Sequence, residues 1–124
     1  MPIKDVATPA RDELAVASAL FHSLSDRTRL AILRRLAEGE TRVVDLTRTL
    51  ELPQSTVSSH LACLRDCRLI TGRPQGRQVF YAVAHPQLLD LLAAAETLLA
   101  VTGHAVALCP NYGIDTRTGG EVRQ

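Results

Sequence analysis

Residues Gln54–Ile70 read QSTVSSHLACLRDCRLI, and this stretch decides how the rest of the chain is interpreted. At 100° per residue, Val57, Leu61 and Leu64 fall within about 60° of one another, which predicts a helix with one buried face. The first two turns of this helix are polar and rich in hydroxyl groups, and the last two turns carry two cysteines. We therefore expect a single helix with two chemically different ends.

The residues before this helix predict a second, shorter helix and a tight turn. Val43–Leu50 has apolar residues at helical spacing, and Glu51-Leu52-Pro53 follows it directly. Pro53 cannot lie inside a continuous helix, because it lacks the backbone N–H and its ring clashes with the preceding turn. Two short helices joined by a three-residue turn, the second beginning with polar residues, are typical of a helix-turn-helix.

The residues after the helix predict a β-hairpin. The segment Thr71–Gln78, TGRPQGRQ, is rich in glycine, proline and arginine, and it is followed by the strand-forming residues Val79–Val83. A hairpin directly after a recognition helix forms the wing of a winged helix-turn-helix. The expected fold class is therefore mainly α with a small β-hairpin, a dimeric winged helix-turn-helix.

The flanking regions complete the predicted domain. We expect helices at residues 10–24 and 27–37, the latter capped by Asp26, and a last helix from Pro86 to about Thr102. Residues 1–9 are expected to be a flexible lead-in and residues 10–102 the DNA-binding and dimerisation domain. Residues 103–124 are expected to be a tail that carries a metal-ligand cysteine and has a disordered end.

Small polar side chains at the start of the central helix favour DNA binding, because they let a helix approach phosphates and base edges closely. Gln54 is suited to adenine, and His60 and Arg65 to phosphates. The alternative is that the hydroxyl groups merely cap and solubilise a surface helix; the turn and the basic wing favour DNA. The predicted DNA-binding residues are Gln54, Ser55, Thr56, Ser58, Ser59, His60 and Arg65 in the helix, and Arg73, Gln75, Arg77 and Gln78 in the wing.

The charge distribution agrees with double-stranded DNA as a partner. The net charge is only +1, but residues 26–78 contain ten arginines against six acidic residues, a balance of +4. The most apolar tract, residues 88–108, is interrupted by charged residues, glycine and histidine, so no membrane partner is expected. The opening residues do not resemble a secretory signal, which predicts a cytoplasmic protein. No motif supports enzyme activity.

Cys63 and Cys67 lie about 40° apart on a side face of the predicted helix. Residues four apart have Cβ atoms about 5–6 Å apart, so two thiolates can meet one thiophilic metal ion. Cys109 is the remaining cysteine and the candidate third ligand, with His104 or water as an open fourth. The alternative is three small buried cysteines with no metal. We expect Asp90 and Glu96 to be charges at a solvated helix edge.

Three segments resemble the ArsR/SmtB family of metal-sensing repressors. They are residues 24–33 (LSDRTRLAIL), 54–61 (QSTVSSHL) and 76–81 (GRQVFY), in this order. The resemblance implies a homodimeric winged helix that binds operator DNA when metal-free and leaves it on metal binding. Glu51 stands where the family often has glycine, so a slightly altered turn is expected.

The resemblance also discriminates among the metal sites of the family. The helix before the turn lacks the Cys-x-Cys of one site, and the last helix lacks the Asp-x-His of another. The remaining match is to the cadmium/lead-sensing CmtR branch, which implies Cys63, Cys67 and Cys109 as ligands, Cys109 coming from the partner subunit. The implied inducer is Cd²⁺ or Pb²⁺, with As(III) undistinguished. A thiol-redox regulator or a winged helix used for protein contacts remain alternatives.

Overall fold

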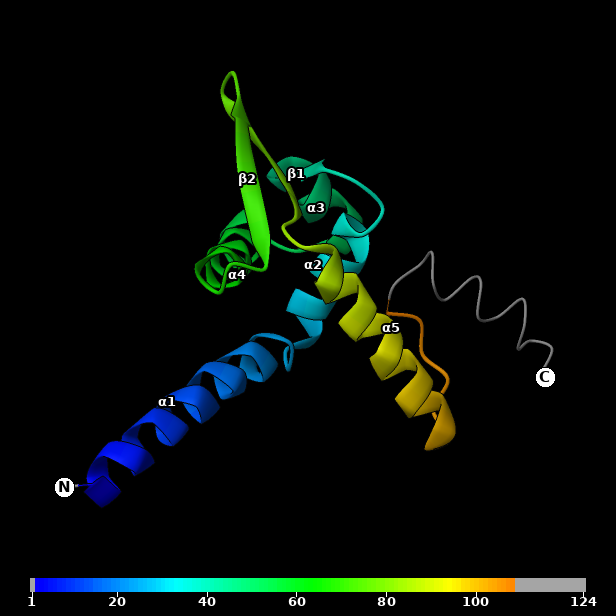
Figure 1. Cartoon of the computed structure of the whole chain (residues 1–124). Helices are drawn as coiled ribbons and strands as arrows, with labels where there is room; N and C mark the ends of the chain where they lie inside the picture. Colours follow the sequence, from blue (N-terminus) through cyan, green and yellow to red (C-terminus); the bar gives the residue numbers. More distant parts are fainter. Residues whose placement is uncertain (1, 109–124) are drawn as a thin grey trace.

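A computed structural model describes residues 2–108 of the chain, and it describes side chains from residue 12 onward. This part is mainly α-helical with a small sheet, as predicted (Figure 1). Its elements in chain order are α1 (Pro2–Ser23), α2 (Arg27–Leu36), β1 (Thr41–Arg42), α3 (Val43–Leu50), α4 (Gln54–Asp66), β2 (Ile70–Gln75), β3 (Gln78–Val83) and α5 (Pro86–Val101).

The turn between α3 and α4 keeps the helix-turn-helix geometry although no glycine is present. Glu51 ends α3 with φ 55° and ψ 49°, the left-handed conformation that glycine adopts without strain. The next amide, that of Leu52, donates to the carbonyl of Thr47 at 3.2 Å. Pro53 then starts α4 from an extended conformation, with φ −61° and ψ 149°. The expected change at Glu51 is therefore strain in one residue and not a different turn.

The wing is part of a three-stranded antiparallel sheet of order β1-β3-β2. The strands β2 and β3 are joined by a two-residue turn in which Gly76 has φ 66°, as short hairpins require. The third strand, β1, pairs Thr41 with Tyr81 and Arg42 with Phe80. Sequence analysis did not predict β1, because two residues are too few for an alternating pattern.

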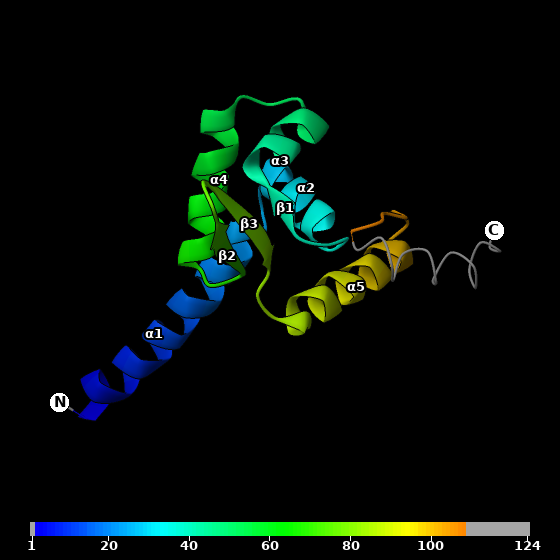
Figure 2. The same cartoon turned by 90° about the horizontal axis from the view of Figure 1, so that it is seen from above.

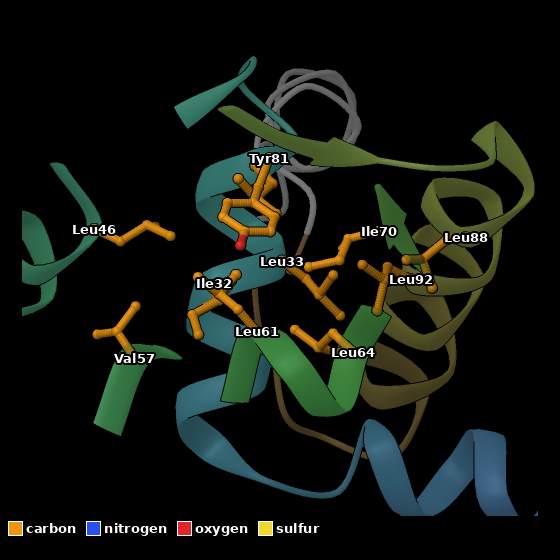
Figure 3. Packing of buried hydrophobic residues seen from close by; sticks show 11 residues of the cluster. Ile32, Leu33, Leu46, Val57, Leu61, Leu64, Ile70, Tyr81, Leu88 and Leu92 are labelled. Carbon is orange, nitrogen blue, oxygen red and sulfur yellow. The ribbon is translucent and has the colours of Figure 1, made fainter. Parts of the chain in front are cut away.

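The core lies where α2, α4, α5 and the base of the sheet meet (Figure 3). The three predicted core residues of α4 are at most 1% exposed. The helix α2 is fixed at its start by Asp26, whose carboxylate accepts the Arg29 N–H at 3.0 Å. The buried hydrophobic cluster comprises Ile32, Leu33, Leu36, Leu46, Val57, Leu61, Leu64, Ile70, Tyr81, Leu88 and Leu92.

The helix α1 is longer than predicted and projects away from this core (Figures 1 and 2). It begins at Pro2, so the prediction of a lead-in over residues 1–9 and a helix from residue 10 was wrong about the helix start. A proline is tolerated in the first helical turn, and Pro9 removes only one backbone bond from the rest. The helix α5 also extends from the body, on the side opposite to the wing (Figure 1).

Residues 104–108 fold back from the end of α5 onto the body of the domain. The N–H of Leu108 donates to Glu96 Oε2 at 2.5 Å, and Arg34 Nη1 donates to the carbonyl of Ala107 at 3.1 Å. Leu108 packs against the core cluster. The prediction that Glu96 is a solvated-edge charge was wrong, since its residue is only 6% exposed. Asp90 is exposed, as expected.

Candidate nucleic-acid interface and metal site

The start of α4 presents most of the predicted DNA-contacting side chains to solvent. Gln54, Ser55, Ser58 and Ser59 are exposed, and Thr56 is half-buried. No side chain caps this end of the helix, so its first backbone N–H groups and the positive end of its dipole face outward. These are the groups that bind phosphate at helix N-termini. Arg65 is exposed in the last turn of the same helix.

His60 has partners inside the protein, unlike the other polar residues of this helix. Its Nδ1 lies 3.3 Å from Arg29 Nη1 and 3.8 Å from Asp26 Oδ2, and its side chain is 21% exposed. The nearby imidazole lowers the pKa of the Asp26 carboxyl, although the larger cause of this lowering is the hydrogen bond from the Arg29 N–H. The structure thus gives His60 a place between α4 and the start of α2, in contrast to the predicted phosphate contact.

Arg29 connects this pair to the end of α1. Its Nε donates to the Ser23 carbonyl at 2.7 Å and its Nη2 to the His22 carbonyl at 3.1 Å. One guanidinium therefore joins three elements: α1, α2 and α4. Sequence analysis missed Arg29, because a contact across 31 residues leaves no periodic signal.

In the wing, Arg73 is engaged within the protein, whereas Arg77 is exposed at the tip. Arg73 donates to both carboxylate oxygens of Glu40, at 2.7 and 3.1 Å, and its guanidinium carbon lies 5.2 Å from the Phe80 ring centre. The Arg73 hydrogen bond lowers the pKa of the Glu40 carboxyl. Arg73 also donates to Gln75 Oε1 at 2.9 Å. It therefore stabilises the wing, leaving Arg77 as the free cation near its turn.

A groove of about 290 Å³ brings the recognition helix and the wing together. Its lining includes Gln54 from α4 and Arg77 and Gln78 from the wing, which are far apart in the sequence. It also includes Arg42, which sequence analysis missed. Arg42 Nη1 donates to Gln78 Oε1 at 2.8 Å, and its Nε donates to Asp45 at 2.9 Å. That hydrogen bond lowers the pKa of the Asp45 carboxyl and keeps the ion pair charged.

Cys63 and Cys67 are free, half-buried thiols one helical turn apart. Cys67 forms the C-cap of α4, and its Sγ lies 2.8 Å from the hydroxyl oxygen of Ser23. The helix then ends at Arg68, which has φ 63°, and the Leu69 N–H donates to the Leu64 carbonyl at 3.0 Å. These bonds complete a Schellman-type end, so the position of Cys67 is fixed by the way α4 stops.

The fit of these thiols to a metal is that of half a site. Thiolates at this spacing suit a thiophilic ion, which needs further ligands. Among the residues with described positions, no group of three or more His, Cys, Asp or Glu side chains is arranged to hold an ion. His104 is exposed and belongs to no such group. Cys109, the predicted third ligand, lies outside the described residues.

Comparison with known proteins follows the same outline. The profile of the arsR family of bacterial regulatory proteins matches residues 26–71, from the cap of α2 to the start of the wing. A probable mercury resistance operon repressor of Streptomyces lividans is 34% identical over 104 residues, 84% of this chain and 78% of that protein. The chain belongs to the ArsR family. The transcriptional regulator CmtR of Mycobacterium bovis is 41% identical over 83 residues, 66% of this chain and 70% of CmtR.

Solved structures support the fold of this ArsR-family protein. HlyU from Vibrio cholerae superposes with a TM-score of 0.63 at 32% identity, covering 71% of this chain and 96% of HlyU. The winged helix-turn-helix domain Mb0332 from Mycobacterium bovis, described as homodimeric, gives a TM-score of 0.71 at 23% identity, covering 78% and 90%. The matched relatives are transcriptional regulators, which confirms the expectation that the protein is not an enzyme. Within residues 2–108, no helix is long and apolar enough to cross a membrane.

Proposed function

We propose that this ArsR-family protein is a homodimeric repressor that binds operator DNA when metal-free and dissociates on binding a thiophilic metal ion. The observation that carries the proposal is the position of Cys63 and Cys67 in the same helix as the exposed DNA-facing residues Gln54–Ser59. An ion held at one end of α4 can therefore act on the orientation of the other end.

The DNA half of the proposal rests on the groove between α4 and the wing. Exposed hydroxyl and amide groups at the start of α4 are suited to base edges and phosphates, and Arg77 supplies a cation beside them. In a dimer, two such helices enter successive major-groove faces about 34–36 Å apart. The operator should therefore be an imperfect palindrome.

The dimer half rests on apolar side chains that one chain leaves in solvent. Leu14 and Phe21 of α1 are 70% and 59% exposed, and Leu98 and Val101 of α5 are 64% and 78% exposed. Large exposed apolar side chains on projecting helices mark interaction surfaces. A second copy of the chain is the partner we propose for them, by analogy with the homodimeric Mb0332.

The metal half proposes Cys63, Cys67 and Cys109 as three thiolate ligands. Such a set suits Cd²⁺, Pb²⁺ or As(III) and disfavours Mg²⁺ and Ca²⁺, which prefer oxygen. The likeness to CmtR favours Cd²⁺ or Pb²⁺, and the name of the Streptomyces lividans relative adds Hg²⁺ to the candidates.

We propose that Cys109 comes from the partner subunit. Leu108, the residue before it, lines a groove formed by α2 and the end of α3, with no residue of α4. The chain therefore reaches Cys109 from a different side of the domain than the one where Cys67 meets Ser23. This placement favours donation across the dimer over closure within one chain.

The release step is a shift between two dimer conformations. A metal ion that ties α4 to the tail favours the conformation in which the two recognition helices no longer match the groove spacing. A difference of a few kcal/mol in metal affinity between the two states is enough, since allosteric coupling is typically about 1–3 kcal/mol.

Fluorescence anisotropy with the promoter DNA of the protein's own gene tests the proposal, with and without Cd²⁺, Pb²⁺, Hg²⁺, Zn²⁺ and arsenite. The wild-type dimer should bind DNA without metal and release it with thiophilic ions. Cys63→Ser and Cys67→Ser should bind DNA normally and fail to release it. Cys109→Ser should show weaker thiolate-to-metal absorbance. Loss of DNA binding in both helix variants would contradict the division of α4 into two functional ends.

A second candidate function is redox sensing through the same two thiols. Cys63 and Cys67 are free and half-buried, and a solved structure of reduced HlyU from Vibrio cholerae is 32% identical with a TM-score of 0.61. Peroxide would oxidise the two thiols to a disulfide and be reduced to water. Peroxide-driven DNA release in the presence of a chelator, reversed by dithiothreitol, would favour this function over metal sensing.

A further inference from the structure

Ser23 is a buried hydroxyl that lies against one of the proposed metal ligands. It is the last residue of α1 and is 1% exposed, and its Oγ lies 2.8 Å from Cys67 Sγ. Its own carbonyl accepts the Arg29 Nε–H at 2.7 Å. Ser23 therefore touches the thiol on one side and the guanidinium that reaches His60 on the other.

We propose that Ser23 is a positioning residue for the Cys67 ligand and transmits the metal-bound state of that sulfur to α1 and, through Arg29, to His60. This inference rests on the proposed metal-sensing function. It assigns to Ser23 and Arg29 a role in connecting the two ends of α4, which contain the DNA-facing residues and the thiols.

The chemistry of the contact changes when the thiol binds a metal. In the free thiol either atom can be the hydrogen-bond donor. On metal binding the thiol proton leaves to solvent, and the sulfur retains only lone pairs, so the Ser23 hydroxyl must donate. A buried donor on a ligand sulfur fixes its orientation, and removal of such outer contacts typically weakens metal binding about 10–100-fold.

The geometry carries this change to the DNA-facing half of α4. The corner between α1 and α2 contacts α4 at two points, Cys67 through Ser23 and His60 through Arg29. These points are seven residues apart, about 10 Å along the helix at 1.5 Å per residue. A displacement of Cys67 toward a metal ion therefore acts on the corner, and the corner acts on both α1 and the middle of α4.

The experiment compares Ser23→Ala with the matched control Ser25→Ala. The Ser25 hydroxyl donates to the His22 carbonyl at 2.7 Å at the same corner, and the residue is exposed. Cadmium affinity is measured by competitive titration with thiolate-to-metal absorbance, and operator affinity by anisotropy with and without Cd²⁺. We expect Ser23→Ala to weaken Cd²⁺ binding about tenfold, to bind operator normally without metal, and to show a smaller Cd²⁺-induced loss of operator affinity. Ser25→Ala should match the wild type.

Equal cadmium affinity and equal DNA release in the two variants would overturn the inference. A measurement on the wild type covers the case in which Ser23→Ala folds poorly. Cd²⁺ loading should change amide hydrogen exchange in residues 22–29 as well as in α4, and a change confined to α4 would also overturn it. Failure of the wild type itself to bind Cd²⁺ or to release DNA is a separate outcome, which contradicts the proposed function.

Discussion

His60 Nδ1 in the DNA-facing helix lies 3.3 Å from Arg29 Nη1 at the start of α2, and the Asp26 carboxylate lies 3.8 Å away on the same side. The three side chains fasten the recognition helix to the corner that ends α1. A residue that the sequence predicted as a phosphate contact is therefore placed to orient the helix.

His60→Ala tests this placement. Because the imidazole accepts from Arg29 inside the protein, its loss should lower the free energy of unfolding by about 1 kcal/mol. The slope of log operator affinity against log salt should stay unchanged, since that slope counts phosphate contacts. Arg77→Ala, at the exposed wing tip, is the matched control and should reduce the slope by about 0.9. A reduced slope with unchanged stability in His60→Ala would restore the phosphate contact.

Asp26 should make stability depend on pH in the acid range. The Arg29 N–H bond and the nearby His60 charge hold the pKa of this carboxyl below its ordinary value of 3.8. A carboxyl with a lowered folded-state pKa stabilises the fold above its unfolded-state pKa, and the contribution is lost as pH falls through the folded-state pKa. Asp26→Ala should therefore cost about 1 kcal/mol at pH 7, and the difference from wild type should shrink below about pH 4.

Urea unfolding between pH 2 and 7 measures this effect. Asp26→Asn is the control, because the amide oxygen can still accept the Arg29 N–H but does not titrate. Its difference from Asp26→Ala should vary little with pH over the acid range. A wild-type advantage over Asp26→Ala that persists to pH 2 would contradict the assigned role of the carboxylate.

Glu51 should be a position where glycine stabilises the protein. Its φ of 55° is costly for a residue with a Cβ atom, by about 1–2 kcal/mol, whereas glycine loses about 0.5–1 kcal/mol through the greater freedom of the unfolded chain. Glu51→Gly should thus raise the free energy of unfolding by up to about 1 kcal/mol. Thermal unfolding with Glu51→Ala as control checks this, and equal stability of the two variants would contradict it.

Glu96 should hold residues 104–108 against the domain. Its carboxylate accepts the Leu108 N–H at 2.5 Å from a buried position. Glu96→Ala leaves that donor without this acceptor and should lower the free energy of unfolding by about 1–3 kcal/mol. Hydrogen exchange of the Leu108 amide should become faster. Glu96→Gln retains an acceptor oxygen and should protect the amide better, and equal exchange in both variants would remove Glu96 as the anchor.

The sequence by itself determined the helix-turn-helix, the wing and the core face of α4, because each depends on local periodicity or on turn residues such as Pro53 and Gly76. It also identified the two thiols one turn apart, since helical geometry fixes that spacing. The family followed from short local motifs in a set order.

Only the tertiary structure decided which polar side chains face DNA and which hold the protein together. His60 and Arg73 have partners 31 and 33 residues away in the chain, and Ser23 meets Cys67 across 44 residues. Glu96 is buried because residues 104–108 return over α5, which no pattern within α5 encodes. Hydrogen bonds between distant residues depend on how the helices pack, and sequence periodicity reports only which face of a helix is apolar.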